Sequence, residues 1–78
     1  MDIKAKIKDV LVQLLKVKPE ELKDNINLSD AIGIDSTEMV ETLIALDKEF
    51  GTKLSPQEVT KFSTINDIEK IIQSKLGK

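Results

Sequence analysis

The sequence contains no cysteine, histidine, tryptophan or tyrosine among its 78 residues. Without cysteine the chain forms no disulfide, and without cysteine or histidine a zinc site is not expected. The same absences remove the side chains from which enzymes most often build an activated nucleophile or a proton shuttle. The composition therefore disfavours catalysis and requires a fold that is held by the packing of apolar side chains alone.

Long apolar runs are also missing. No stretch approaches the roughly 20 apolar residues of a membrane-spanning helix, and the N-terminal segment lacks the apolar run of a secretory signal. We therefore expect a soluble cytoplasmic protein with no membrane insertion, and the lack of cysteine fits a reducing compartment. The length suits a single domain over residues 1–78. The chain has only two aromatic side chains that could stack on bases, and its lysines are dispersed along the sequence, so no nucleic-acid partner is expected.

The charges that are present are unevenly distributed. The formal net charge is only −2, but residues 20–49 hold nine acidic residues and only Lys23 and Lys48 as bases. An acidic middle between basic ends predicts a positively charged protein partner for the middle.

Three segments repeat apolar residues with the spacing of one helix face. The first predicted helix covers residues 2–16 and ends before Pro19. The second begins at residues 35–36 and stops at Gly51, and the last follows Thr64 as its cap. The expected inward residues are Ile3, Ile7, Val10, Leu11, Leu14, Leu15, Met39, Leu43, Leu46, Phe50, Ile65, Ile68, Ile71, Ile72 and Leu76.

The connections between these helices differ in character. Residues 17–35 carry Pro19, Gly33 and several Asn and Asp residues, which predicts a long structured loop with one helical turn near residues 20–23. Its apolar residues are expected to pin the loop to the core; they are Leu22, Ile26, Leu28 and Ile32. Ser55, Pro56 and Glu58 form the pattern of a helix start, which predicts a short helix over residues 55–61. The predicted fold is all-α: a small four-helix bundle of three main helices and one short helix, with a long structured loop between helices one and two.

Ser36 stands at the predicted start of the second helix, where Asp35 and Glu38 form the pattern of a capping box. A serine at such a position is most often only a cap. It is also a good place to attach a phosphodiester, because free backbone N–H groups and the helix dipole stabilise an anion there. The residues by themselves leave both interpretations open.

The segment Gly33-Ile34-Asp35-Ser36 follows a first helix that ends near a proline and precedes a helix that ends Glu49-Phe50-Gly51. It resembles the attachment segment of acyl carrier proteins, which usually reads Gly-x-Asp-Ser-Leu. The resemblance continues through Val40-Glu41, Ala45-Leu46 and residues 64–72, and so covers nearly the whole chain.

The resemblance implies a non-catalytic carrier. Ser36 would receive 4'-phosphopantetheine from coenzyme A through a phosphopantetheinyl transferase, the holo-synthase, and would carry acyl groups as thioesters on the arm. The pathway implied is fatty-acid biosynthesis or related acyl metabolism, the acyl chain would be sheltered between the helices, and the protein would be a monomer. Asp35 would help to orient the modifying enzyme and its metal-bound coenzyme A.

The resemblance also implies that acyl-transferring and acyl-modifying enzymes dock on the second helix through basic patches. Asp47 and Glu49 support a binding surface there, because the C-terminal end of a helix favours cations and both are acids. An ordinary solvated acidic face is the alternative. The expected partner-binding residues are Asp35, Thr37, Glu38, Val40, Glu41, Ile44 and Asp47. No metal site is predicted, since the acids near Ser36 do not follow the spacing of a calcium loop.

Two residues depart from the family pattern. Thr37 stands where leucine usually follows the modified serine, and Lys48 interrupts the acids near the end of the second helix. Both favour, as an alternative, a specialised carrier for a polyketide, aminoacyl or other dedicated pathway. A third hypothesis, from another class, is an unmodified helical protein-interaction domain in which Ser36 is only a cap.

Overall fold

The long helices begin where the sequence offers a capping side chain. The computed structural model describes residues 2–77, and its first helix, α1 (Ile3–Leu15), starts where Asp2 Oδ1 accepts a hydrogen bond from Ala5 N at 3.1 Å. The last helix, α4 (Ile65–Lys75), starts with a reciprocal capping box between Thr64 and Asp67. Such caps satisfy amide groups that have no partner within the helix, so local sequence fixes both starting points.

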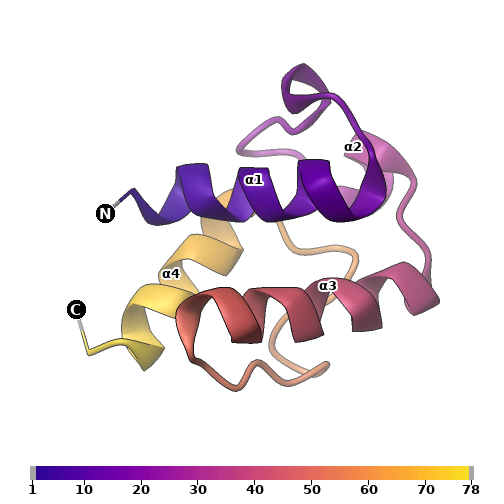
Figure 1. Ribbon diagram of the computed structural model, residues 1–78. Helices are drawn as coiled ribbons and strands as arrows, with labels where there is room; N and C mark the ends of the chain where they lie inside the picture. The colour runs from indigo at the N-terminus through magenta and orange to yellow at the C-terminus, as the bar shows by residue number, and fades with distance from the viewer. Residues whose placement is uncertain (1, 78) are drawn as a thin grey trace.

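Helix α1 packs against both α3 (Ser36–Phe50) and α4. Helices α1 and α3 lie side by side with opposite chain directions, and residues 16–35 form the connection at one end of the pair (Figure 1). The apolar side chains enclosed between the helices are almost wholly aliphatic: Ile3, Ile7, Leu11, Leu22, Leu28, Ile34, Met39, Leu43, Leu46, Leu54, Val59, Ile65, Ile68 and Ile72. The prediction of an all-α bundle with three main helices is confirmed.

The short helix lies in a different place from the one predicted. Helix α2 (Leu28–Ile32) occupies part of the segment that was expected to be loop. Asn27 Oδ1 caps it by accepting from Asp30 N at 2.9 Å, and Gly33 ends it in the left-handed region at φ 64°. Only five residues lie between these two signals, too few for the apolar spacing to reveal a helix face. One further turn in this connection, of 3₁₀ type, covers Pro19–Glu21.

The short helix predicted over residues 55–61 is wrong: the segment makes a single turn and then leaves helical geometry. Val59 N donates to Ser55 O at 3.1 Å, which closes that one turn. Beyond it, the carbonyl of Lys61 accepts from Ser29 N at 2.8 Å and the carbonyl of Ser63 accepts from Leu28 N at 3.1 Å. The start signal is therefore real, but the backbone after it bonds to the beginning of α2 instead of continuing a helix.

Some side chains lie at depths that the apolar pattern did not predict. Ile26 was expected in the core and is 39% exposed, and Leu14, on the predicted inner face of α1, is 37% exposed. Thr42 and Ile34 were not expected in the core, yet both are buried. The described helices include none long and apolar enough to cross a membrane.

The long connection is tied to two helices by Asp24. Lys8 Nζ lies 2.6 Å from Asp24 Oδ1, and Lys4 Nζ lies 3.3 Å from Asp24 Oδ2. The backbone carbonyl of Asp24 also accepts from Asn66 N at 3.1 Å, at the start of α4. The hydrogen bond from Lys8, with that from Lys4, lowers the pKa of the Asp24 carboxyl despite partial desolvation. The loop that leads to α2 and α3 is thus held against α1 and α4.

Candidate functional site

Ser36 is the first residue of α3 and its side chain is exposed. The cap of this helix is supplied by Asp35, whose Oδ1 accepts from Glu38 N at 2.8 Å, while Glu38 Oε1 accepts from Asp35 N at 3.1 Å. The capping box predicted from the sequence is therefore present, and Asp35 is its N-cap. Because Asp35 performs the capping, the hydroxyl of Ser36 is left out of that role.

The start of α3 offers backbone donors to an anion on Ser36. A helix begins with amide groups that have no partner within the helix. Here the amides of Asp35 and Glu38 are bound by the capping box, which leaves those of Ser36 and Thr37, within the described chain, without a protein partner. Two free amides and the positive end of the helix dipole suit a phosphodiester on the Ser36 hydroxyl.

An apolar hollow of about 350 Å³ opens beside Ser36, between α3 and residues 56–62. Its lining includes three buried apolar side chains, Met39, Leu43 and Val59. The exposed Phe62 also lines it, with Lys61 Nζ 5.4 Å from the ring centroid. The lining residues are Ser36, Met39, Val40, Leu43, Pro56, Val59, Thr60, Lys61 and Phe62. A hollow of this kind is suited to an aliphatic chain that is attached at Ser36.

The segment that forms one side of the hollow is held by polar contacts of Ser55 and Glu58. Glu58 Oε2 accepts from Ser55 N at 2.8 Å and lies 3.0 Å from Lys75 Nζ on α4. The hydrogen bond from the Ser55 amide, with that from Lys75, lowers the pKa of the Glu58 carboxyl. Together with the backbone bonds to α2, these contacts fix the segment without filling the hollow.

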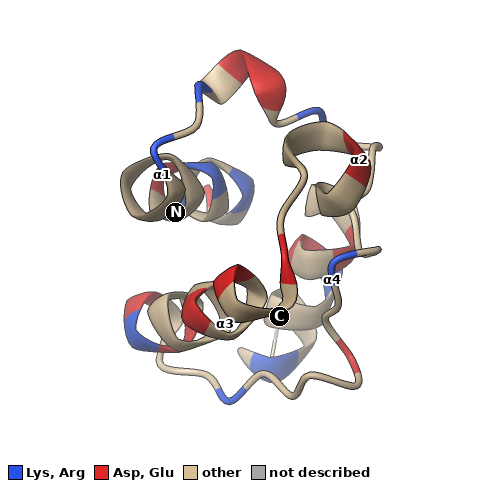
Figure 2. Ribbon diagram, turned by 90° about the vertical axis from the view of Figure 1, so that its right-hand side faces the viewer, with Lys and Arg blue, Asp and Glu red and all other residues tan. Residues whose placement is uncertain are grey.

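The exposed face of α3 carries most of the residues predicted to bind partners. Val40 and Ile44 are each 53% exposed, although both are large aliphatic residues. Thr37 and Glu41 are exposed beside them, and Glu38 is half-buried in the capping box. Acidic positions recur along α3, whereas lysines are prominent on α1 (Figure 2). The structure therefore gathers these residues on the helix that begins at Ser36.

Asp47 lies apart from this group. Its Oδ1 accepts from Leu54 N at 2.9 Å and from Thr52 Oγ1 at 3.2 Å, and so it braces the chain after α3. Glu49 pairs with Lys6 of α1 at 3.2 Å. The two acids that seemed out of place at the C-terminal end of the helix thus have structural partners. Sequence spacing could not show this, because the partners come from residues beyond the helix.

Within residues 2–77, no group of three or more carboxylates is arranged to hold a metal ion. The features that remain are an exposed hydroxyl at a helix start, free amides around it and an apolar hollow beside it. Together they suit a small carrier domain, one that holds a covalently attached group and presents it to other proteins.

Comparison with known proteins identifies the kind of carrier. Residues 5–72 match the family model described as phosphopantetheine attachment site, and the chain belongs to that family. It is 31% identical over 75 residues to an acyl carrier protein of Bdellovibrio bacteriovorus, with 96% of each chain covered. It is 34% identical over 68 residues to an acyl carrier protein of Wolinella succinogenes, covering 87% of this chain and 90% of the relative.

Family membership confirms the predicted class, prosthetic group and lack of catalytic activity. The chain is a non-catalytic carrier of 4'-phosphopantetheine. As a member of this family it interacts with a phosphopantetheinyl transferase and with acyl-processing enzymes. The geometry at the start of α3 fits the phosphodiester of that group.

Proposed function

We propose that Ser36 carries the 4'-phosphopantetheine group and that acyl intermediates travel on its thiol as thioesters, in fatty-acid biosynthesis or related acyl metabolism. The observation that carries this proposal is the position of Ser36, exposed at the first residue of α3 and at the edge of an apolar hollow. We assign this function to a single cytoplasmic, monomeric domain that spans residues 1–78.

The attachment reaction assigns distinct roles to neighbouring residues. The Ser36 hydroxyl attacks the phosphate of coenzyme A that bears pantetheine; the bond from that phosphate to the nucleotide breaks, and the hydroxyl proton is removed. The amides of Ser36 and Thr37 then lie beside the new phosphodiester. Asp35 fixes the helix start through its capping bond and contributes its negative charge to the binding of the transferase and metal-bound coenzyme A.

The docking face in this proposal consists of Asp35, Thr37, Glu38, Val40, Glu41 and Ile44, with Asp47 near the other end of α3. The acidic members attract basic patches on partner enzymes, and the exposed aliphatic pair supplies the apolar centre. The hollow beside Ser36 receives the acyl chain between encounters.

The first experiment is intact-mass measurement after incubation with coenzyme A and a broad-specificity phosphopantetheinyl transferase. We expect the wild type to gain one phosphopantetheinyl group and Ser36→Ala to gain none. Ser74→Ala, which alters another exposed serine, is the matched control and should be modified like the wild type. Failure of the folded wild type to react with several transferases would leave only the docking-domain hypothesis.

The pathway is decided by the cargo. Thr37 and Lys48 are the residues that favour a polyketide, aminoacyl or other dedicated pathway over general fatty-acid synthesis. Mass analysis of the carrier isolated from its native cells identifies the thioester-bound group. A series of straight-chain acyl groups would support fatty-acid synthesis, whereas one unusual acyl or aminoacyl group would support the dedicated alternative.

A further inference from the structure

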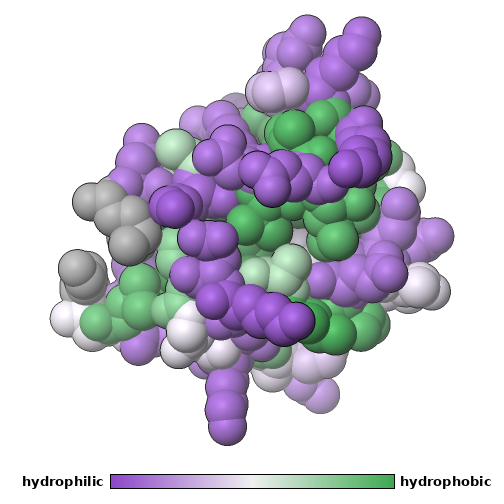
Figure 3. All heavy atoms as spheres, viewed as in Figure 1, coloured by the Kyte–Doolittle hydropathy of each residue, from purple (hydrophilic) through white to green (hydrophobic). Residues whose placement is uncertain are grey.

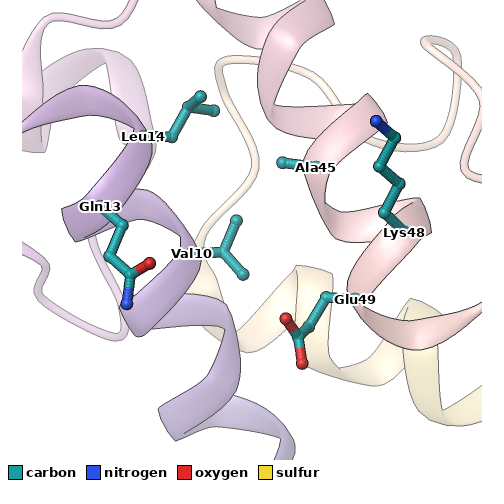
Figure 4. Close-up of a pocket in the computed structure, with 6 residues that line it drawn as sticks. All are labelled: Val10, Gln13, Leu14, Ala45, Lys48 and Glu49. Atoms are coloured by element: carbon teal, nitrogen blue, oxygen red, sulfur yellow. The ribbon is translucent and has the colours of Figure 1, made fainter.

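A second hollow lies on another side of α3, between this helix and α1. It has a volume of about 400 Å³ and is lined by Val10, Gln13, Leu14, Ala45, Lys48 and Glu49. Val10, Leu14, Ala45 and Glu49 point into the gap between the helices, whereas the Lys48 side chain runs along the side of α3 away from α1 (Figure 4). This groove is separate from the hollow beside Ser36, with which it shares no lining residue.

The groove is part of a larger apolar surface. Leu14 on α1 is 37% exposed and Ile44, next to Ala45 on α3, is 53% exposed. Apolar atoms gather over the space between the two helices on the face seen in Figure 3. Contiguous exposed apolar surface is uncommon on a small soluble domain except where another molecule binds. The surface continues along α3 to Val40 and thus adjoins the proposed docking face.

The charges around the groove differ from those near Ser36. Glu49 is neutralised by Lys6 at 3.2 Å, and Asp47 is turned toward Thr52 and Leu54. Lys48 forms no ion pair with any residue in the range 2–77. Its ammonium group is therefore a cation without a carboxylate partner among the described residues at this end of α3, whereas Glu41 is exposed on the half nearer Ser36.

We propose that the groove between α1 and α3 binds a helix of a partner protein that inserts aliphatic side chains between Val10, Leu14 and Ala45 and places an acidic side chain opposite Lys48. The inference rests on the proposed carrier function, since it names a second element of the docking face. A partner complementary to the whole face is basic opposite Glu41 and acidic opposite Lys48. Lys48 is then a specificity-determining residue, because it repels enzymes whose docking patch is uniformly basic.

Two short alanine-based helical peptides serve as probes. Both present leucines at i, i+4 and i+7 on one face; one flanks them with glutamate and the other with lysine. Binding is followed by amide chemical shifts of the isotope-labelled protein, with and without the phosphopantetheine group. We expect the glutamate peptide to shift the amides of Val10, Gln13, Leu14, Ala45 and Lys48 and to bind more tightly than the lysine peptide.

Variants separate the apolar and charged contributions. Leu14→Gln should abolish most of the binding, whereas Ile26→Gln, which changes a side chain of nearly equal exposure outside the groove, should have no effect. Lys48→Glu should lower the affinity for the glutamate peptide about two- to fivefold, as expected for the loss of an exposed ion pair. It should raise the affinity for the lysine peptide by a similar factor.

Several results would overturn the proposal. Equal binding of the two peptides would exclude the role assigned to Lys48, and shifts confined to residues 56–62 would exclude a helix in the groove. Groove shifts that depend on protein concentration alone would assign the groove to a second copy of the chain. Groove shifts that follow the length of an acyl group on Ser36 would assign it to the cargo. The peptide measurement on unmodified protein does not depend on Ser36, so its failure is distinct from failure of the mass experiment.

Discussion

At the scale of single residues, Thr42 is the clearest departure from an apolar core. It lies on the buried side of α3 with no exposed surface, and its Oγ1 has no hydrogen-bond partner among residues 2–77. A buried hydroxyl without a partner costs free energy because it loses its contacts with water.

Replacing Thr42 by valine keeps the shape of the side chain and removes this unpaired group. We expect Thr42→Val to raise the free energy of unfolding by about 1 kcal/mol. The measurement is urea denaturation, with exposed Thr37→Val as the control, which should change stability little. A destabilised Thr42→Val protein would mean that the hydroxyl does have a partner in solution.

Asp35 combines a structural and a functional role, and two substitutions separate them. Asp35→Ala removes the N-cap and should cost about 1 kcal/mol of stability. Asp35→Ser retains a capping oxygen without the charge and should recover most of that loss. If the carboxylate also guides the transferase, both variants should be modified more slowly at Ser36. Equal modification rates for Asp35→Ser and the wild type would restrict Asp35 to its capping role.

At the scale of the elements, Asp24 joins the long connection to α1 and α4. Its pKa is lowered in the folded protein, chiefly by the hydrogen bond from Lys8, from an ordinary value of 3.8. A carboxyl whose pKa is lowered by folding stabilises the folded state at pH values above its ordinary pKa. This stabilisation is lost as the pH falls through the pKa that the carboxyl has in the folded protein.

We therefore expect Asp24→Asn to unfold at lower urea concentration than the wild type near neutral pH. The difference should persist down to about pH 4 and shrink below it, and added salt should reduce it. Glu20→Gln changes an exposed acid of the same connection and is the control. A difference between Asp24→Asn and the wild type that stays constant to about pH 2 would contradict the role given to the lysines.

The three long helices could be predicted from the sequence because a start signal and apolar residues at helical spacing occur in the same segment. Asp35 and Thr64 marked the beginnings of α3 and α4 correctly, and α1 begins within one residue of the predicted start at residue 2, although its cap, Asp2, was not predicted. The sequence did not reveal the short helix. Asn27 and Gly33 bound α2, but the five residues between them are too few for apolar spacing to indicate a helix. Ser55 and Glu58 gave a true start signal whose helix did not continue, because carbonyls farther along bond to α2.

The candidate site was predictable only in part. The exposure of Val40 and Ile44 followed from the position of the inward stripe on α3, and Ser36 and Asp35 were found by motif. The hollow beside Ser36 could not be predicted, since its outer wall depends on how residues 56–62 pack. The bracing role of Asp47 depends likewise on contacts with Thr52 and Leu54, which no helix periodicity encodes.

At the scale of the whole molecule, the hollow beside Ser36 is apolar surface that the protein alone leaves uncovered. An acyl chain that enters it should stabilise the folded state, because each methylene removed from water contributes up to about 0.8 kcal/mol. We expect the urea midpoint of the acylated carrier to rise with chain length until the hollow is filled. An acetylated carrier is the control, and equal midpoints across the series would show that the chain stays in solvent.

The wall of this hollow and the segment that leads to Ser36 share a pair of backbone hydrogen bonds, from Leu28 and Ser29 to the carbonyls of Ser63 and Lys61. A widening of the hollow that moves Lys61 either strains the hydrogen bond from Ser29 or moves α2 with it. We therefore expect an acyl chain that widens the hollow to shift α2, several residues before the attachment serine. A partner that touches α2 could distinguish a filled carrier from an empty one without contacting the cargo itself.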